Sequence, residues 1–165
     1  MLPVLALVAL PVTADAHSRW AFIIAGEKYD FVVGSLNEPI AVDDKTGLDL
    51  RISKDGVPVS GLEEALKVEL GAGGVTKVTD ISPVHNSPGA YKNTFYPTVA
   101  TTLSYRIFGT IGETPFDYTF SCNPAGHAVA EDDTSEVAVS EGVTRVLQAG
   151  SFGCPAAKED LGFPE

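Results

Sequence analysis

The sequence predicts an all-β protein, an antiparallel immunoglobulin-like β-sandwich of about 7–8 strands. Apolar and polar residues alternate with a period of two along several short segments, most clearly over residues 48–53 and 114–121. Turn sequences such as Asp55-Gly56 and the glycine-rich residues 71–74 separate these segments at short intervals. No segment has the longer periodicity of a convincing amphipathic helix, so two packed sheets are the architecture that would bury the apolar faces.

The expected strands follow one another closely along the chain. They cover residues 21–24, 29–35, 48–53, 66–70, 75–82, 91–96, 103–111 and 114–121. In the last of them Phe116, Tyr118 and Phe120 share one face with Cys122, whereas the residues between them are polar. Cys122 therefore ends a row that we expect to face the core, which suits a buried disulfide.

The N-terminal residues have the pattern of a signal peptide. Residues 2–12 are apolar apart from prolines, and Ala14-x-Ala16 follows as a small-residue cleavage site. We therefore predict a signal peptide over residues 1–16, an immunoglobulin-like β-sandwich over residues 17–122 and a C-terminal extension over residues 123–165. No Lys or Arg precedes the apolar run, which leaves an alternative, an uncleaved leader that contacts a membrane.

Cys122 and Cys154 are the only cysteines. In an exported protein they are expected to form a disulfide, which would close a loop of about thirty residues and contribute roughly 3–4 kcal/mol of stability. The bond would anchor the C-terminal extension to the sandwich. A pair of thiolate metal ligands is the alternative, and an oxidising compartment disfavours it. The predicted location is extracytoplasmic: the periplasm, the cell surface or the medium.

The charge and the motif content exclude several functional classes. The chain has 22 acidic and 11 basic residues and a net charge of −11, so it lacks the basic surface of a nucleic-acid-binding protein. An anionic membrane surface is excluded as a partner for the same reason. No nucleophile elbow, phosphate-binding loop, zinc-protease helix or dinucleotide fingerprint is present. We therefore expect a protein that is not an enzyme and assign no catalytic residues.

The chain has three histidines, His17, His85 and His127. In an antiparallel sandwich each short connection reverses the chain, so strand ends alternate between two poles. Counting strands places His17, the loop at residues 37–45 and His127 at one pole, and His85 at the other. Three carboxylates are expected near the first pole: Glu38, Asp43 and Asp44.

Cleavage after Ala16 would make His17 the first residue, with a free amine and an imidazole that can bind one metal ion together. His127 would add a second imidazole, and a nearby carboxylate an oxygen ligand. Nitrogen and oxygen ligands in a roughly square plane favour Cu(II), whereas the soft ligand for Cu(I), Met1, would be lost with the leader. The alternative is that His127 only caps a turn in residues 123–126 and that no metal binds.

Several segments resemble patterns in small exported bacterial and archaeal proteins. They are residues 29–39 (YDFVVGSLNEP), 88–91 (PGAY), 95–98 (FYPT) and 109–112 (GTIG). Together they are similar to the YtkA-like and FixH-like immunoglobulin-type domains and, more distantly, to the CopC family of periplasmic copper carriers. The resemblance covers roughly residues 17–121 and implies the fold. From the copper carriers it transfers only His17, because their mature chains also begin with histidine, whereas their methionine-rich Cu(I) site has no counterpart here.

These observations predict an exported, non-enzymatic binding or accessory domain, with Cu(II) binding through the N-terminal histidine as its specific form. The alternative is a structural domain without metal that binds an envelope or membrane protein in a larger assembly. An oxidative copper enzyme would need a second inward-facing histidine, an open axial position and a substrate platform, for which the chain offers few candidates.

Overall fold

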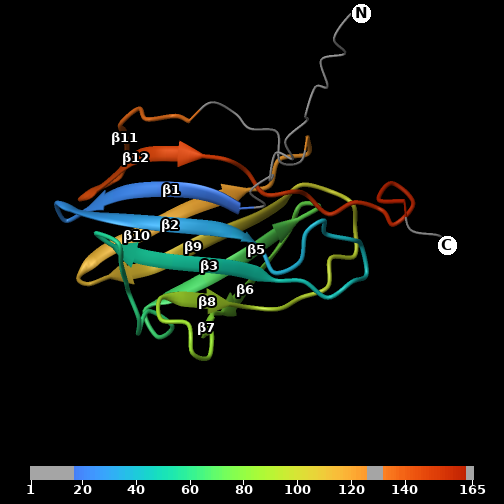
Figure 1. Cartoon of the computed structure of the whole chain (residues 1–165), viewed down its shortest axis with the longest axis horizontal. Helices are drawn as coiled ribbons and strands as arrows, with labels where there is room; N and C mark the ends of the chain where they lie inside the picture. Colours follow the sequence, from blue (N-terminus) through green and yellow to red (C-terminus); the bar gives the residue numbers. More distant parts are fainter. Residues whose placement is uncertain (1–16, 126–131, 163–165) are drawn as a thin grey trace, which may run out of the picture.

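The computed structural model describes residues 17–125 and 132–162, and this part of the chain contains β-strands and no helix. Two antiparallel sheets pack into a sandwich, so the predicted fold class is confirmed (Figure 1). The strands are β1 (His17–Ile24), β2 (Glu27–Ser35), β3 (Leu48–Lys54), β4 (Val57–Pro58), β5 (Leu66–Ala72), β6 (Val75–Asp80), β7 (Ser82–Pro83), β8 (Ala90–Lys92), β9 (Leu103–Ile111), β10 (Thr114–Ser121), β11 (Val137–Ser140) and β12 (Val143–Ala149).

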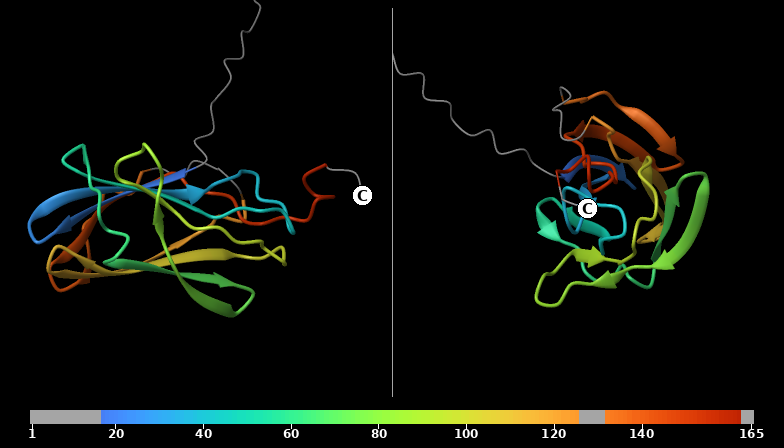
Figure 2. Two further views of the ribbon diagram at one scale, coloured as in Figure 1. Left: turned by 90° about the horizontal axis from the view of Figure 1, so that it is seen from below. Right: turned by 90° about the vertical axis from the view of Figure 1, so that its right-hand side faces the viewer.

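The two sheets differ in size. The larger sheet has the order β11-β12-β1-β2-β3-β8-β7, with β4 paired to β3, and the smaller has the order β10-β9-β5-β6. Figure 2 shows the two layers from two further directions. No helix in the described part of the chain is long and apolar enough to cross a membrane.

The C-terminal region contributes to the sandwich itself. β11 and β12 form a hairpin around the turn at Glu141-Gly142. Its second strand pairs with β1 from Arg19 to Ile24, so residue 122 is not the limit of the sandwich. The sequence of a hairpin indicates that it forms but not which edge strand it joins, because that pairing depends on residues far away in the chain.

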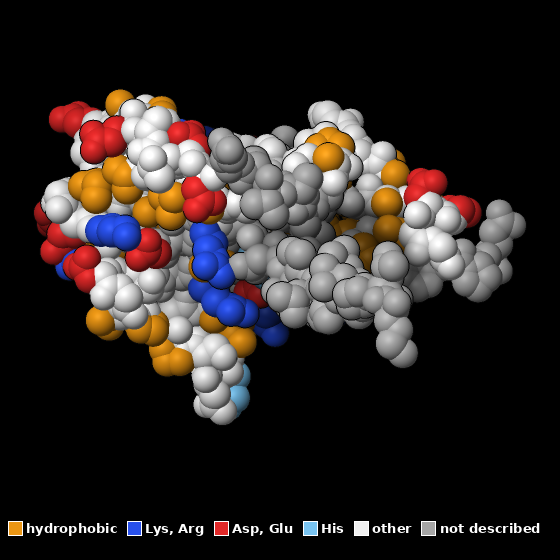
Figure 3. Space-filling view, turned by 45° about the horizontal axis from the view of Figure 1, so that its top comes forward, with side chains coloured by type: hydrophobic (Ala, Val, Ile, Leu, Met, Phe, Trp, Pro, Cys, Tyr) orange, Lys and Arg blue, Asp and Glu red, His pale blue; other side chains and the backbone are white. Residues whose placement is uncertain are grey.

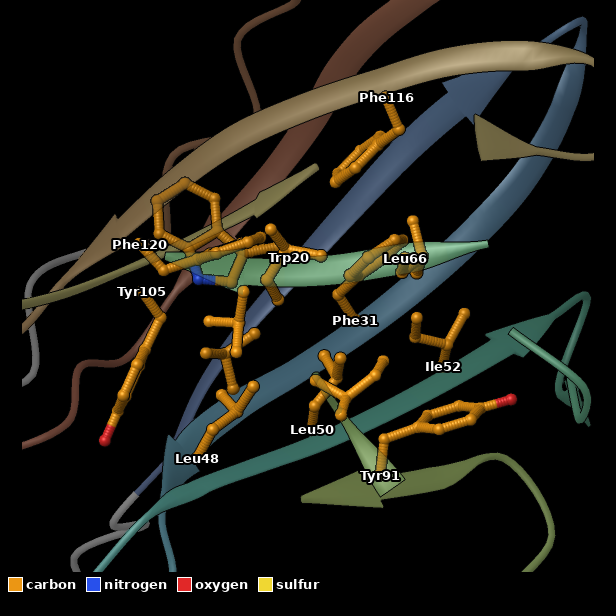
Figure 4. Close-up of a cluster of buried hydrophobic side chains, with 14 of the residues drawn as sticks. Trp20, Phe31, Leu48, Leu50, Ile52, Leu66, Tyr91, Tyr105, Phe116 and Phe120 are labelled. Carbon is orange, nitrogen blue, oxygen red and sulfur yellow. The ribbon is translucent and has the colours of Figure 1, made fainter. Parts of the chain in front are cut away.

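Aromatic side chains fill the space between the sheets (Figure 4). Phe22, Phe31, Phe116 and Phe120 are all at most 1% exposed, and the ring centroids of their contacting pairs lie between 5.0 and 6.3 Å apart. Each fully buried side chain of this kind contributes roughly 1.5–3 kcal/mol. The inward rows of β1, β2 and β10 thus hold the two layers together.

The first strand begins earlier than the sequence indicated. It was expected at residue 21, with Trp20 outside it, but β1 begins at His17 and Trp20 is 7% exposed. The indole packs edge-to-face on Tyr118 and Phe120, each with centroids 5.3 Å away. The sequence did not indicate the earlier start because Ser18 is polar and yet faces the core. Its hydroxyl donates a hydrogen bond to the Val33 carbonyl at 2.9 Å.

The strand expected over residues 91–96 is shorter than the sequence indicated, since β8 ends at Lys92. The backbone N–H of Leu48 donates to the side-chain Oδ1 of Asn93 at 2.9 Å. An amide side chain therefore occupies the acceptor position that a continuing strand would offer, and the pairing resumes only as a single bridge between Thr46 and Phe95.

The predicted disulfide between Cys122 and Cys154 is present, with Cα atoms 5.0 Å apart. It follows the inward row of β10 and holds residues 150–156 against the end of the sandwich. Phe152, two residues before Cys154, is fully buried and stacks on Tyr105 with centroids 5.4 Å apart. The anchored segment is thus part of the core at the end of the molecule where β1 begins.

Candidate functional site

His17 begins β1 and faces outward from the larger sheet. Its cross-strand neighbour is Gly34 of β2, and the neighbour of Gly34 is Asp49 of β3. The imidazole Nε2 lies 3.1 Å from Asp49 Oδ2, so the ring reaches across a whole strand. This is allowed only because the intervening residue is glycine: a Cβ on Gly34 would lie 2.4 Å from Cδ2 of the ring.

The His17–Asp49 pair is partly shielded from water, with side chains 23% and 16% exposed. The hydrogen bond to Asp49 raises the pKa of His17, against the opposing effect of burial, and the nearby carboxylate of Glu38 raises it further. The same hydrogen bond lowers the pKa of Asp49. Arg51 lies on the other side and donates to Asp49 Oδ2 at 3.4 Å. At mildly acidic pH the pair is therefore an ion pair.

The contact to Asp49 also fixes which ring nitrogen can bind a ligand. The Asp49 carboxylate accepts a hydrogen bond from the Nε2–H group, so the neutral imidazole is held as the tautomer whose Nδ1 is unprotonated. Nδ1 is the ring nitrogen nearer to the residue's own backbone nitrogen. The His17 ring thus presents its Lewis-basic atom on the side of its main chain.

Glu38 connects this site to the segment that the disulfide anchors. Its Oε1 accepts a hydrogen bond from the Ser35 N–H at 3.3 Å, and its Oε2 accepts one from the Gly153 N–H at 3.1 Å. The loop between β2 and β3 therefore joins residues 150–156 beside His17. A carboxylate held by two backbone donors is a fixed negative charge rather than a mobile one.

The face around His17 carries charges of both signs. Arg19 and Arg51 line a shallow depression of about 370 Å³ with His17, and Val32 and Leu147 contribute apolar walls. Figure 3 shows Lys and Arg side chains gathered in a short band on the face that carries β12 and β1. Asp30, Asp49 and Glu38 are the charges that favour a cation here, and the arginines oppose it.

The structure brings together some of the residues expected at this pole. Glu38 is close enough to influence His17 electrostatically. Asp43 and Asp44 lie on the same loop, where the Asp43 N–H donates to the Pro97 carbonyl at 2.7 Å and Asp44 pairs with Lys158 at 2.8 Å. The Asp44 carboxylate is therefore engaged by a lysine, and the main chain of Asp43 is fixed by the neighbouring loop.

Of the other two histidines, the structure describes the position of His85 and not that of His127. His127 lies outside the described residues, so its predicted role as a second ligand stays a prediction. Asn123, a little earlier in the chain, pairs with Gly153 beside the anchored segment. His85 lies in the loop between β7 and β8, whose Gly89 carbonyl accepts from the Ile52 N–H at 2.9 Å, toward the end of β3 away from Asp49.

Sequence reasoning missed Asp49 and Gly34. Asp49 was visible only as a polar residue in the alternation of residues 48–53, and Gly34 as part of a strand. The alternation within each strand does predict that Asp49 and Gly34 face outward. The register that places them level with His17, however, is a property of the assembled sheet. Among the described residues, no group of three or more His, Cys, Asp or Glu side chains is arranged to hold a metal ion.

No protein-family model matches the chain, and no curated protein or solved structure is significantly similar to it. The resemblance to YtkA-like, FixH-like and CopC proteins therefore stays a prediction.

Proposed function

We propose that the mature protein is an exported, non-enzymatic binding domain that holds Cu(II) through His17. The observation that carries the proposal is the hydrogen bond from Nε2 to Asp49 across Gly34. It leaves Nδ1 as the metal-binding nitrogen, and Nδ1 forms a chelate ring with the amine of an N-terminal histidine. Amine and neutral imidazole nitrogens are ligands that Cu(II) prefers, and a carboxylate on the second ring nitrogen is the usual support of a metal-bound histidine.

Two features support an extracytoplasmic location for this activity. The sequence before His17 has the pattern of a cleavable leader, and cleavage is what would create the amine ligand. The disulfide between Cys122 and Cys154 is typical of proteins that fold in an oxidising compartment.

The remaining ligands for Cu(II) would come from the end of the sandwich where His17 lies. Glu38 supplies a negative charge near the imidazole, and His127 is the second nitrogen donor in the proposal. Protons compete with the metal for Nδ1, and Asp49 raises the pKa of His17. Binding is therefore expected to weaken at mildly acidic pH, as the imidazole takes up its second proton.

The proposal is tested by titrating Cu(II) against a competing chelator with protein that begins at His17. One-to-one binding is expected, with loss of affinity on His17→Ala and on acetylation of the amine. Asp49→Asn should weaken binding by about 10–100-fold, the usual effect of removing such a support. His85→Ala is the matched control and should bind normally. Equal affinity in His17→Ala and the parent protein would refute the proposal.

A structural domain of an envelope assembly is the second candidate function. The observation that favours it is an exposed apolar groove beside β6, where Val75 and Tyr96 are 72% and 60% exposed. A purified protein that binds Cu(II) only weakly, yet co-purifies from membranes with one partner at a fixed ratio, would support this candidate over the metal carrier.

A further inference from the structure

The smaller sheet has an open edge at β6. Among the described strands β6 pairs only with β5, so half of its backbone N–H and C=O groups point away from the sheet. All residues of β6 except Thr79 are exposed. Figure 2 shows the green β5–β6 hairpin at the outer side of the molecule, next to the yellow segment that connects β8 to β9. This edge is a template for one more strand.

A groove of about 680 Å³ runs between the hairpin and residues 94–99. Leu70, Ala72 and Leu103 are among its apolar lining residues, and all three belong to or pack against the core of the sandwich. The opposite wall carries Phe95 and Tyr96. The groove is therefore continuous with the hydrophobic core, and an extended chain lying along β6 would place alternate side chains into it.

Exposed apolar side chains concentrate around this groove. The large hydrophobic residues that the described part of the chain exposes are Leu36, Val57, Val75, Val78, Tyr96, Val99 and Val137. Three of these, Val75, Tyr96 and Val99, line the groove, whereas Val78 lies opposite Glu69 on the outward face of β6. Scattered apolar residues are normal on a surface, whereas a cluster beside a free sheet edge marks an interaction site.

The charge of the groove specifies what it can accept. Its described lining residues include Lys77 and no Asp or Glu, although acidic residues outnumber basic ones 22 to 11 in the chain. In the register of the hairpin Lys77 is opposite Leu70, so it projects from the core-facing side of β6. Lys77 takes part in no ion pair within the described part of the chain. An inward lysine at a sheet edge discourages pairing with apolar or basic strands and leaves a carboxylate as the matching group.

We infer that β6 and this groove bind an extended strand of a partner protein, in which apolar side chains alternate and one acidic side chain pairs with Lys77. Backbone hydrogen bonds to β6 would supply affinity, and the groove and Lys77 would supply specificity. A second copy of the chain fits less well, because each copy has a net charge of −11 and the two would repel. The inference does not depend on Cu(II) binding.

The test uses a displayed library of short random linear peptides panned on the full-length protein. Enriched peptides should alternate apolar residues around an Asp or Glu, and their binding should slow hydrogen exchange at β6 amides. Lys77→Glu should weaken binding by about tenfold, and a peptide with Lys in place of its acid should restore it. Tyr96→Ala should weaken binding to a similar degree. Lys28→Glu, a charge reversal on the other sheet, is the matched control and should bind normally.

Several outcomes would overturn the inference. One is the failure of the library to yield any peptide that protects β6, and another is equal affinity for the parent protein and Lys77→Glu. Peptides whose affinity survives N-methylation at alternate positions do not pair as strands. If sedimentation shows a dimer that Val75→Lys dissociates, the occupant is a second copy. If removing residues 1–16 exposes β6 amides to exchange, the occupant is the leader of this chain.

Discussion

Replacing Gly34 with alanine tests the geometry of the proposed site. The new Cβ would lie 2.4 Å from Cδ2, 2.7 Å from Cγ and 2.9 Å from Nε2 of His17. The imidazole is 23% exposed and can swing into solvent, so we expect it to leave and the bond to Asp49 to break. Because Gly34 has no positive φ, alanine fits the strand backbone without strain.

Two opposing effects set the size of the change in stability. Loss of a partly exposed ion pair costs about 0.5–1 kcal/mol. Replacing glycine by alanine inside a strand stabilises by roughly 0.5–1 kcal/mol through the unfolded chain. The two effects nearly cancel at mildly acidic pH, but only the first depends on pH.

The direction of the pH dependence follows from the two pKa shifts. The pKa of His17 is raised above 6.5 in the folded protein, so its contribution is complete below that value and is lost as the pH rises through the folded pKa. The pKa of Asp49 is lowered below 3.8, so its contribution is present above that value and is lost at lower pH. The pair therefore stabilises most between about pH 4 and 6.5.

The assay is urea unfolding of the full-length protein, in which the His17 amine is in a peptide bond and cannot titrate. The fluorescence of the buried Trp20 reports unfolding. Gly34→Ala should match the parent protein near about pH 5.5 and exceed it by roughly 0.5–1 kcal/mol near about pH 8.5, while the pKa of His17 falls toward 6.5. Asp49→Asn, the control, should lose stability at the lower pH without the gain at the higher. A difference that does not change with pH would refute the reasoning.

Three further predictions concern the parts of the fold that support the site. Cys122 and Cys154 are separated by 32 residues, so replacing both with serine should lower the free energy of unfolding by about 4 kcal/mol. A parent protein whose stability does not change when the disulfide is reduced would contradict this. Phe152→Ala, at a fully buried position, should cost about 3–5 kcal/mol in denaturant unfolding, whereas the control Val57→Ala, at a position 66% exposed, should stay within about 0.5 kcal/mol. Gly109 has φ 141°, and a Cβ there would lie 2.0 Å from the carbonyl oxygen of Ala65, just before β5. Gly109→Ala should therefore lower the free energy of unfolding by more than about 2 kcal/mol. If the variant melts like the parent protein, β9 can shift to make room, and the prediction is wrong.

The sequence was most informative where one strand could be considered by itself. Alternation over residues 48–53 predicted that Leu48, Leu50 and Ile52 face the core, and each is at most 1% exposed. The row on β10 likewise predicted a buried Cys122, which is 5% exposed and bonded to Cys154. Ser18 shows where this reasoning fails, because an inward hydroxyl with a backbone acceptor breaks the pattern of hydropathy without breaking the strand.

The candidate site could be predicted only in part. The N-terminal position of His17 after a leader was visible in the sequence, as was the tendency of the loop with Glu38 to lie at the same pole. The residue that orients the imidazole could not be identified from the sequence, because Asp49 and Gly34 lie beside His17 only through the register of β1, β2 and β3. The lysine in the groove was equally hidden, because its significance comes from the position of β6 as the edge strand of its sheet in the described part of the chain.

Alternation along the chain thus determined the fold class and the faces of the strands, because successive side chains of a strand point to opposite sides whatever its neighbours are. The presence of two cysteines after a leader sequence predicted the disulfide. The tertiary structure decided which strands became neighbours: β12 beside β1, Asp49 level with His17, and β6 left at an edge. Those pairings join residues far apart in sequence and depend on how whole sheets bury their faces together, which no single segment encodes.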